Sequence, residues 1–202
     1  MPSQTNAQEP SDGALLAEAA AGGEAAFVEL YRRRRDDVYR FAYALTRSRS
    51  FAQDATQEVF LQVLEKAGRF DPAKGTARAW LLGCARHVVI DRLRADNRRD
   101  GDVPEQTTAA DHELRVLSEQ RLVRLHAAIA GLPFEYREAL VLCELAELAY
   151  AEAAAVLGCP VGTVRSRLHR ARALLAASLR AAEREPENDG ERAVMKITEA
   201  CS

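Results

Sequence analysis

The sequence predicts an all-α protein made of two small helical domains that a flexible acidic linker joins. Seven prolines and eleven glycines in 202 residues leave long uninterrupted stretches, and alanine, the strongest helix former, is abundant. No segment shows the alternation of apolar and polar residues that is typical of a strand. Helical periodicity instead occupies residues 14–99 and 114–182. Residues 100–113 between them combine glycine, proline, threonine and acidic residues without a lysine or arginine.

The first domain is predicted to begin after a polar tail, residues 1–13, which we expect to be disordered. From about Ala14 onward, apolar residues recur three and four positions apart, the spacing of one helical face. That face also carries Arg34, for which the sequence shows no partner. The arginine run 32–35 fits a solvated helix face better than a nucleic-acid-binding patch. The apolar members of the face are Phe27, Leu30, Tyr31, Val38, Phe41, Ala42 and Leu45.

Two further helices are predicted in this domain, over about 51–66 and about 77–97, with a loop over 68–75 between them. The second of these helices has a basic face, since residues 76–100 contain six arginines and three aspartates, a net charge of +3. Arg92 lies toward the apolar side of its helical wheel, where we expect it to pair with an acid. The polar side of the wheel holds Arg86, His87, Arg94, Asn97 and Arg98.

Aromatic residues accompany this basic face. Phe70 and Trp80 flank the start of the helix, and a cationic face beside aromatic rings and a loop is typical of a surface that binds single-stranded DNA. Bases stack on the rings while arginines meet the phosphates. For Trp80 taken alone, packing in the core is the favoured interpretation.

In the second domain, helical periodicity resumes near Leu114 and stops at Pro133, which suits the first position of the next helix. Neither glycine nor proline interrupts residues 141–157, so propensity alone predicts one long helix there. The charged residues 183–202 at the end of the chain are predicted to be irregular.

The last predicted helix, residues 161–182, is the most basic part of the chain. No acidic residue occurs between positions 153 and 182, where five arginines give a charge of +5. A short helix, a turn over 158–160 that contains glycine, and an arginine-faced helix together indicate a helix-turn-helix; a surface helix that is basic by chance is the alternative. The predicted DNA-facing residues are Arg165, Ser166, His169, Arg170 and Arg172, which lie away from the apolar face of Val164, Leu168, Ala171, Leu175 and Leu179.

Nothing in the sequence indicates an enzyme or a cofactor. It contains no glycine-rich phosphate loop, nucleophile elbow or HExxH motif. Cys84 and His87 could share a helical turn, but no second pair stands at zinc-site spacing, so a buried thiol beside an exposed histidine is favoured over a metal site. No apolar run approaches the ~20 residues that cross a bilayer, and the N-terminus does not read as a signal peptide. We therefore expect a cytoplasmic protein that does not insert into a membrane.

Four stretches of this sequence resemble a known family. They are AQDATQEVFLQV and RAWLLGCARHVVIDRLR, which resemble the region-two domain of bacterial sigma factors, and LPFEYREALVL and AEAAAVLGCPVGTVRSRLHRARALL, which resemble their region-four domain. Only the short acidic linker separates the two halves. That layout is similar to the small extracytoplasmic-function (ECF) sigma factors, and the resemblance covers roughly Phe27 to Leu179.

The resemblance implies a protein that binds core RNA polymerase, recognises two elements of promoter DNA and helps to melt the DNA. It implies polymerase docking through Asp54, Gln57, Glu58 and Phe60. The loop from Phe70 to Thr76 matches the one that captures a flipped base of the minus-ten element, and a pocket that holds an extruded base favours open DNA. With the aromatic and basic residues above, the minus-ten surface comprises Phe70, Trp80, Arg86, His87, Arg94, Asn97 and Arg98, and the minus-thirty-five reader comprises Arg165, Ser166, His169, Arg170 and Arg172.

The sequence also departs from the family pattern. His87 stands where asparagine is frequent, which bears on base preference. Ala149 stands where serine or threonine often caps the first helix of the helix-turn-helix, and loss of a cap costs about 1 kcal/mol. Ala153 replaces a larger aliphatic residue and predicts a thinner core.

Two domains on a flexible tether are expected to expose both DNA-facing surfaces when free, and the resemblance implies an anti-sigma factor that covers them. Two other functions compete with this one. A DNA-binding regulator would need a ligand pocket or phospho-acceptor aspartate in the first domain. A helical interaction protein without a DNA role does not account for the acid-free arginine stretch.

Overall fold

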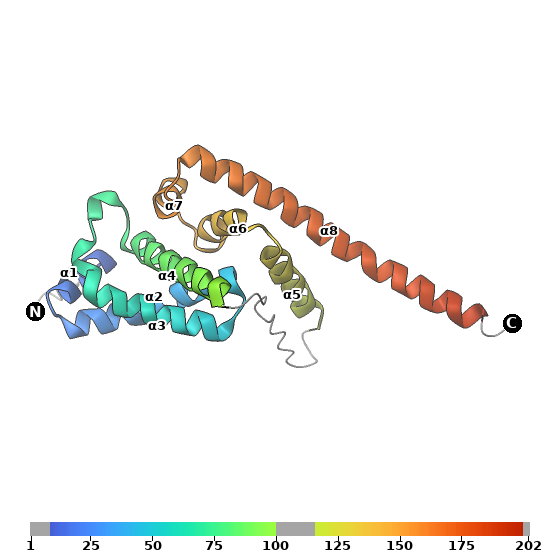
Figure 1. Cartoon of the computed structure of the whole chain (residues 1–202), viewed down its shortest axis with the longest axis horizontal. Coiled ribbons are helices and arrows are strands. Elements are labelled where there is room, and N and C mark those ends of the chain that lie inside the picture. Colours follow the sequence, from blue (N-terminus) through green and yellow to red (C-terminus); the bar gives the residue numbers. More distant parts are fainter. Residues whose placement is uncertain (1–8, 100–115, 200–202) are drawn as a thin grey trace, which may run out of the picture.

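The computed structural model describes residues 9–99 and 116–199, with side chains over 9–95 and 122–182. These ranges are helical between short turns and form no strand, as an all-α chain of two domains requires (Figure 1). The first domain contains α1 (Asp12–Ala20), α2 (Glu24–Thr46), α3 (Arg49–Lys66), the 3₁₀ turns η1 (Ala67–Arg69) and η2 (Pro72–Lys74), and α4 (Ala77–Arg99). The second contains α5 (Val116–Ala130), α6 (Phe134–Leu140), the π-helical turn η3 (Val141–Leu145), α7 (Tyr150–Leu157) and α8 (Val161–Glu199).

The first domain is built around α2, which packs against α1, α3 and α4. The apolar stripe that the sequence predicts on α2 forms one side of its core, with Leu30 and Ala42 completely buried. Helix α3 contributes Val59 and Val63, which are equally inaccessible to water. Burial of each such aliphatic side chain stabilises the fold by roughly 1.5–3 kcal/mol, so this stripe holds the three long helices together.

The structure starts the first helix earlier than the sequence predicts. Helix α1 begins at Asp12, because the hydroxyl of Ser11 accepts a hydrogen bond from the backbone of Ala14 at 3.2 Å and caps the helix. The predicted disordered tail, residues 1–13, therefore overlaps the start of α1 at Asp12. Residues 1–8 of the tail lie outside the described part of the chain. Gly22, with a left-handed φ of 91°, provides the turn that separates α1 from α2.

The prediction of one long helix over residues 141–157 is wrong. The chain leaves helical geometry after η3, and Glu147 takes a left-handed φ of 51° before α7 begins. This break turns the side chain of Leu148 into the core, where it is 6% exposed. Tertiary packing thus overrides local propensity. Pro133 likewise lies just before α6 rather than at its first position.

Helix α7 begins without a side-chain cap at Ala149, as its sequence predicts. The carboxylate of Glu152 instead accepts a hydrogen bond from the Ala149 backbone N–H at 3.2 Å. This is one half of the reciprocal capping arrangement, in which a residue three positions inside the helix bonds back to the cap. It compensates in part for the missing hydroxyl.

The final helix is longer than predicted. We expected an irregular segment over 183–202, but α8 continues to Glu199. Residues 181–185, Ala-Ala-Glu-Arg-Glu, are strong helix formers and carry the helix beyond its predicted end. The predicted acidic linker, 100–113, lies outside the described residues.

The two domains pack against each other, contrary to the expectation that the tether leaves them apart. Helix α7 lies on α4, and η3 and α5 touch α2. Among the described side chains, three polar contacts cross this interface: Arg86 pairs with Glu138, Arg137 donates to the carbonyl of Leu45 at 2.6 Å, and Thr76 donates to Glu152 at 2.6 Å. Buried apolar residues of both domains form one continuous cluster across it, which explains why the domains associate.

The strained turn before α7 gives a stability prediction. A side chain at a left-handed φ costs about 1 kcal/mol relative to glycine. We expect Glu147→Gly to have a free energy of unfolding about 1 kcal/mol higher than Glu147→Ala, measured by urea denaturation. The alanine variant is the matched control, because it removes the same exposed carboxylate but keeps the strain. Equal stability of the two variants would contradict this interpretation of the turn.

Candidate nucleic-acid interface

The first half of α8 presents the two faces that its sequence predicts. Val164, Leu168 and Ala171 are at most 2% exposed and anchor the helix to its domain. The five predicted minus-thirty-five residues all lie on the exposed side: Arg165, Ser166, His169, Arg170 and Arg172. Gly158, with a left-handed φ of 65°, ends α7 and lets the chain turn into α8. The helix-turn-helix geometry therefore follows from one buried stripe and one glycine.

Each arginine of this face has a partner that the sequence did not indicate. The guanidinium of Arg165 lies over the ring of Tyr150, 6.0 Å from its centroid. Arg170 donates to the hydroxyl of Tyr136 at 3.2 Å.

Arg172 forms a hydrogen-bonded ion pair with Glu144, and this bond raises the pKa of the guanidinium. Glu144 belongs to η3, and Tyr136 and Tyr150 belong to α6 and α7. Their contacts with α8 depend on the turns between the helices, so helical periodicity could not reveal them.

Three residues of the predicted minus-ten surface line a cavity of about 390 Å³ where the loop after α3 meets α4. Two of them, Phe70 and Trp80, meet edge to face, with ring centroids 6.0 Å apart. The third is His87, which is exposed, and Glu152 of α7 also lines the cavity. Trp80 also packs on the core, which is the interpretation that the sequence favours for this residue taken alone. An aromatic-lined cavity beside a basic helix can accommodate a planar base.

The basic face of α4 is divided between this cavity and the domain interface. The Nε atom of Arg86 lies 2.7 Å from Oε1 of Glu138, and Nη2 of the same guanidinium donates to Oε2 at 3.3 Å. The Arg86 side chain is only 18% exposed, so it faces the second domain and not solvent. Arg94 is exposed, 3.9 Å from Asp91. The side chains of Asn97 and Arg98 lie outside the described residues.

Glu138 is the buried acid of this interface. Glu138 is 2% exposed. This desolvation raises the pKa of its carboxyl above the ordinary value of 4.5, although the charge of Arg86 acts in the opposite direction. No local pattern in the sequence indicates this role, because the partner of Glu138 is 52 positions away.

The outer face of α3 carries most of the predicted polymerase-docking residues. Asp54 and Gln57 are exposed, and Glu58 lies beside them. Arg92 of α4 pairs with Glu58 at 2.7 Å and with Asp54 at 3.6 Å, which confirms that it meets an acid.

Phe60 is the exception among these residues. It is 3% exposed and meets the ring of Tyr31 edge-on at 4.8 Å, because it falls on the core side of α3. Phe60 therefore supports the helix from inside. Two exposed apolar residues accompany the acids on the outer face, Leu61 at 63% and Leu64 at 50%, and the sequence analysis missed both.

Within the described side chains, no group of three or more His, Cys, Asp or Glu could hold a metal ion. Cys84 is half-buried, and desolvation raises the pKa of its thiol, while His87 three positions later is exposed. Among the described helices, none is long and apolar enough to cross a membrane.

Comparison with known proteins explains this combination of surfaces. Residues 30–99 match the family model of Sigma-70 region 2, and residues 122–175 match that of Sigma-70, region 4. The "Probable RNA polymerase sigma-C factor" of Mycobacterium bovis is 43% identical over 168 residues, which cover 81% of this chain and 89% of that protein. The chain belongs to the ECF sigma factors. This ECF sigma factor directs RNA polymerase to promoters, and the two competing functions do not account for both matched domains.

Further relatives agree with this assignment. "ECF RNA polymerase sigma factor SigE" of Mycolicibacterium smegmatis is 38% identical over 76% of this chain and 62% of that protein. The structure of CnrH in complex with the cytosolic domain of CnrY has a TM-score of 0.66 and 28% identity, covering 85% of this chain and 99% of that one. The sigma factor RpoE of Bartonella quintana, solved with the anti-sigma factor NepR, also has a TM-score of 0.66, with 27% identity over 76% and 96% of the chains.

The burial of Glu138 gives a prediction about pH. Because its folded-state pKa is raised, its contribution to stability is complete below the ordinary pKa and is lost as the pH rises through the raised value. In urea unfolding measured across that window, we expect Glu138→Gln to gain stability relative to wild type as the pH rises. Glu65→Gln, an exposed change on α3, is the control and should follow wild type. A constant difference between Glu138→Gln and wild type would contradict the assignment.

The pairing of Arg172 gives a prediction about DNA affinity. Glu144→Gln removes a carboxylate that competes with DNA phosphate for this guanidinium. We expect tighter binding to all duplex sequences and a salt dependence steeper by about one phosphate contact, measured by fluorescence anisotropy across a salt titration. In an Arg172→Ala background the Glu144→Gln change should have little effect. An equal gain in both backgrounds would mean that Glu144 acts by general repulsion.

Proposed function

We propose that this ECF sigma factor binds core polymerase through the outer face of α3, reads the minus-thirty-five element with α8, and captures the minus-ten element with α4 and the loop before it. The observation that carries the proposal is the exposed arginine face of α8, held in place by its buried stripe. The protein acts by binding, without catalysis of its own, and works in the cytoplasm, where polymerase and chromosome are.

On α3, the docking surface we propose consists of Asp54, Gln57, Glu58 and Leu61. Two carboxylates beside an exposed leucine suit a partner that is basic and partly apolar. Arg92 holds both carboxylates in place from α4, so the surface is preorganised. Phe60 supports this helix from the core and takes no direct part.

On α8, we propose that Arg165 and His169 read base edges in the major groove, since they lie one turn apart near the start of the helix. Stacking on Tyr150 limits the conformations of Arg165 before DNA arrives. Ser166, Arg170 and Arg172 lie on the same exposed side and position the helix on phosphates.

For the minus-ten element, we propose that a flipped base enters the cavity beside Phe70 and Trp80, with His87 on its wall. Arg94, Asn97 and Arg98 follow along α4 toward the DNA backbone. Arg86 can join them only when its ion pair with Glu138 opens, because the second domain covers its guanidinium. Full engagement of the promoter therefore requires the domains to separate.

We also propose an anti-sigma partner that covers the promoter-binding surfaces. The support is by analogy, since the similar RpoE of Bartonella quintana was solved with the anti-sigma factor NepR. Purification of the protein from its native host under non-inducing conditions tests this partner. Recovery only as free protein or polymerase complex would count against it.

Transcription by purified components tests the function as a whole. We expect the protein and core polymerase together, and neither alone, to produce transcripts from a promoter selected from a random library. Failure to start transcription at any library member would overturn the proposal.

The docking surface gives a first prediction. We expect Asp54→Lys combined with Glu58→Lys to abolish binding of core polymerase in a pull-down, while circular dichroism shows a folded protein. Arg92→Ala is the matched control, because it breaks the same ion pairs but keeps both carboxylates. Undiminished binding by the folded double variant, or equal loss in Arg92→Ala, would show that the acids matter only for the fold.

The recognition helix gives a second prediction. Base-edge contacts discriminate sequence by about 1–3 kcal/mol each, whereas phosphate contacts add affinity with little discrimination. Arg165→Ala should therefore relax preference at particular positions of the upstream element in a promoter library. Arg172→Ala, the control, should weaken binding to all sequences alike. An even loss of affinity in Arg165→Ala would place the recognition face elsewhere on α8.

A further inference from the structure

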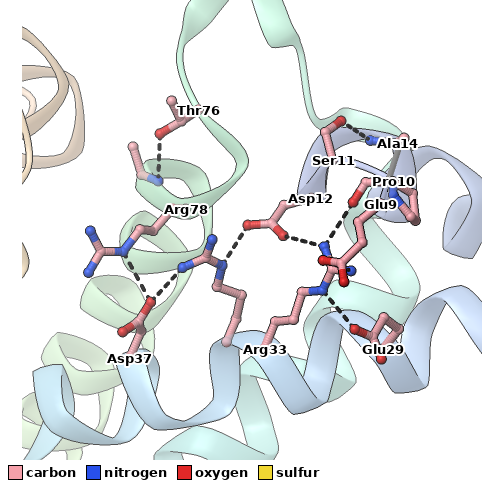
Figure 2. A network of polar contacts seen from close by, with 12 residues as sticks. Glu9, Pro10, Ser11, Asp12, Ala14, Glu29, Arg33, Asp37, Thr76 and Arg78 are labelled. Atoms are coloured by element: carbon pink, nitrogen blue, oxygen red, sulfur yellow. Dashed lines mark hydrogen bonds and ion pairs between the residues drawn. The ribbon is translucent and has the colours of Figure 1, made fainter. Parts of the chain in front are cut away.

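A chain of ion pairs joins three helices of the first domain. Arg34, for which the sequence shows no partner, donates to Asp12 of α1 at 2.5 Å and to Asp37 at 2.9 Å. The same oxygen of Asp37 accepts from Arg78 of α4 at 3.0 Å, as Figure 2 shows. The four side chains are between 12% and 29% exposed. Because these charges are half-buried, their pairing fixes α1 and the start of α4 relative to α2 more firmly than a surface pair would.

Both ends of this chain lie beside the loop from Phe70 to Thr76. At one end, Asp12 is followed by Gly13, and a Cβ atom added to Gly13 would lie 3.3 Å from Cε1 of Phe70. The ring of Phe70 is therefore seated against the backbone of α1. At the other end, Arg78 is in the first turn of α4, where the hydroxyl of Thr76 accepts a hydrogen bond from the backbone of Ala79 at 3.2 Å (Figure 2).

We propose that α1 is a positioning element for base capture: Gly13 seats the Phe70 ring, and the Asp12–Arg34–Asp37–Arg78 chain fixes the distance between that seat and the start of α4. Phe70 meets Trp80 edge to face in the lining of the cavity, so a displacement of α1 that moves the Phe70 ring changes the shape of the cavity. The inference rests on the proposed role of the loop in holding a flipped base. It gives α1, which lies outside the matched region-two segment, a direct part in promoter melting.

The contact between Gly13 and Phe70 offers a substitution that separates positioning from stability. Gly13 is the second residue of α1, and alanine is the better helix former, so Gly13→Ala should not unfold the helix. Its methyl group nevertheless presses on the Phe70 ring, which must move by a few tenths of an ångström. Gly68→Ala is the matched control, because an added Cβ there meets nothing within 4 Å although it lies in the adjacent turn η1.

A second pair of variants tests the ion-pair chain. Asp12→Asn removes the carboxylate charge beside Arg34, and also the one 3.8 Å from Arg33, and leaves Asp37 to hold Arg34 and Arg78. Asp36→Asn is its control, since Asp36, among the described side chains, pairs with the exposed Arg35 on the solvent side of α2, at 3.4 Å.

The experiment uses the full chain bound to core polymerase. The probe is a single-stranded minus-ten oligonucleotide, taken from a promoter that the wild-type holoenzyme selects, with 2-aminopurine at the base to be flipped. We expect Gly13→Ala and Asp12→Asn to weaken capture about fivefold, since small misplacements at such sites have large effects. Core binding and binding to the minus-thirty-five duplex should stay at wild-type levels, and both controls should behave as wild type.

Capture at wild-type strength by both test variants would overturn the proposal. So would a loss of core binding in step with capture, because α1 would then act on the whole domain. If the wild-type holoenzyme itself captures no base, the proposed role of the loop fails, and that result is distinct from a failure of α1 to position it.

Discussion

The arrangement of the two domains depends on one buried carboxylate. Glu138 is almost inaccessible to water, and a charge in that position is stable only beside a cation. The cation comes from the other domain, as Arg86 at 2.7 Å. Such a pair contributes little net stability, because desolvation offsets most of the attraction. It nevertheless disfavours other arrangements of the two domains, since any shift between them leaves a buried charge unpaired. Through this contact, α6 fixes where α7 lies on α4.

Helix α7 therefore contributes to both candidate DNA-binding sites. It braces α8 in the helix-turn-helix, and it closes one side of the cavity that Phe70 and Trp80 line. Its residue Glu152 contributes to both, because its carboxylate bonds to the backbone at the start of α7 and also accepts from Thr76. The residues of α8 that we propose to read the minus-thirty-five element remain exposed in this arrangement, whereas the second domain covers Arg86 of the proposed minus-ten surface. The closed form therefore leaves the first of these proposed surfaces more accessible than the second.

Arginines fall into two groups with different physical roles. Arg34, Arg86 and Arg92 lie partly buried between helices and meet carboxylates from other segments. Arg165, Arg170 and Arg172 are exposed and meet tyrosine rings, a hydroxyl or an accessible carboxylate. The first group is needed to hold the fold, and its charge is already neutralised. The second group keeps exposed partners that DNA can replace, which suits the DNA contacts that we propose for these residues.

The sequence by itself determined the helical class, the division into two domains, the basic face of α8 and the segment that forms the cavity loop. Each of these depends on residues a few positions apart, and helical periodicity or a glycine turn encodes such local relations. Only the tertiary structure decided which arginines are neutralised between helices and which stay exposed. The partners that Arg34, Arg92 and Arg86 find on other helices lie 22, 34 and 52 positions away, and no periodicity relates such residues. The same cause explains why Phe60 is a core residue, why the chain breaks at Glu147 and why the domains close, since each outcome is set by burial against a distant segment and not by local propensity.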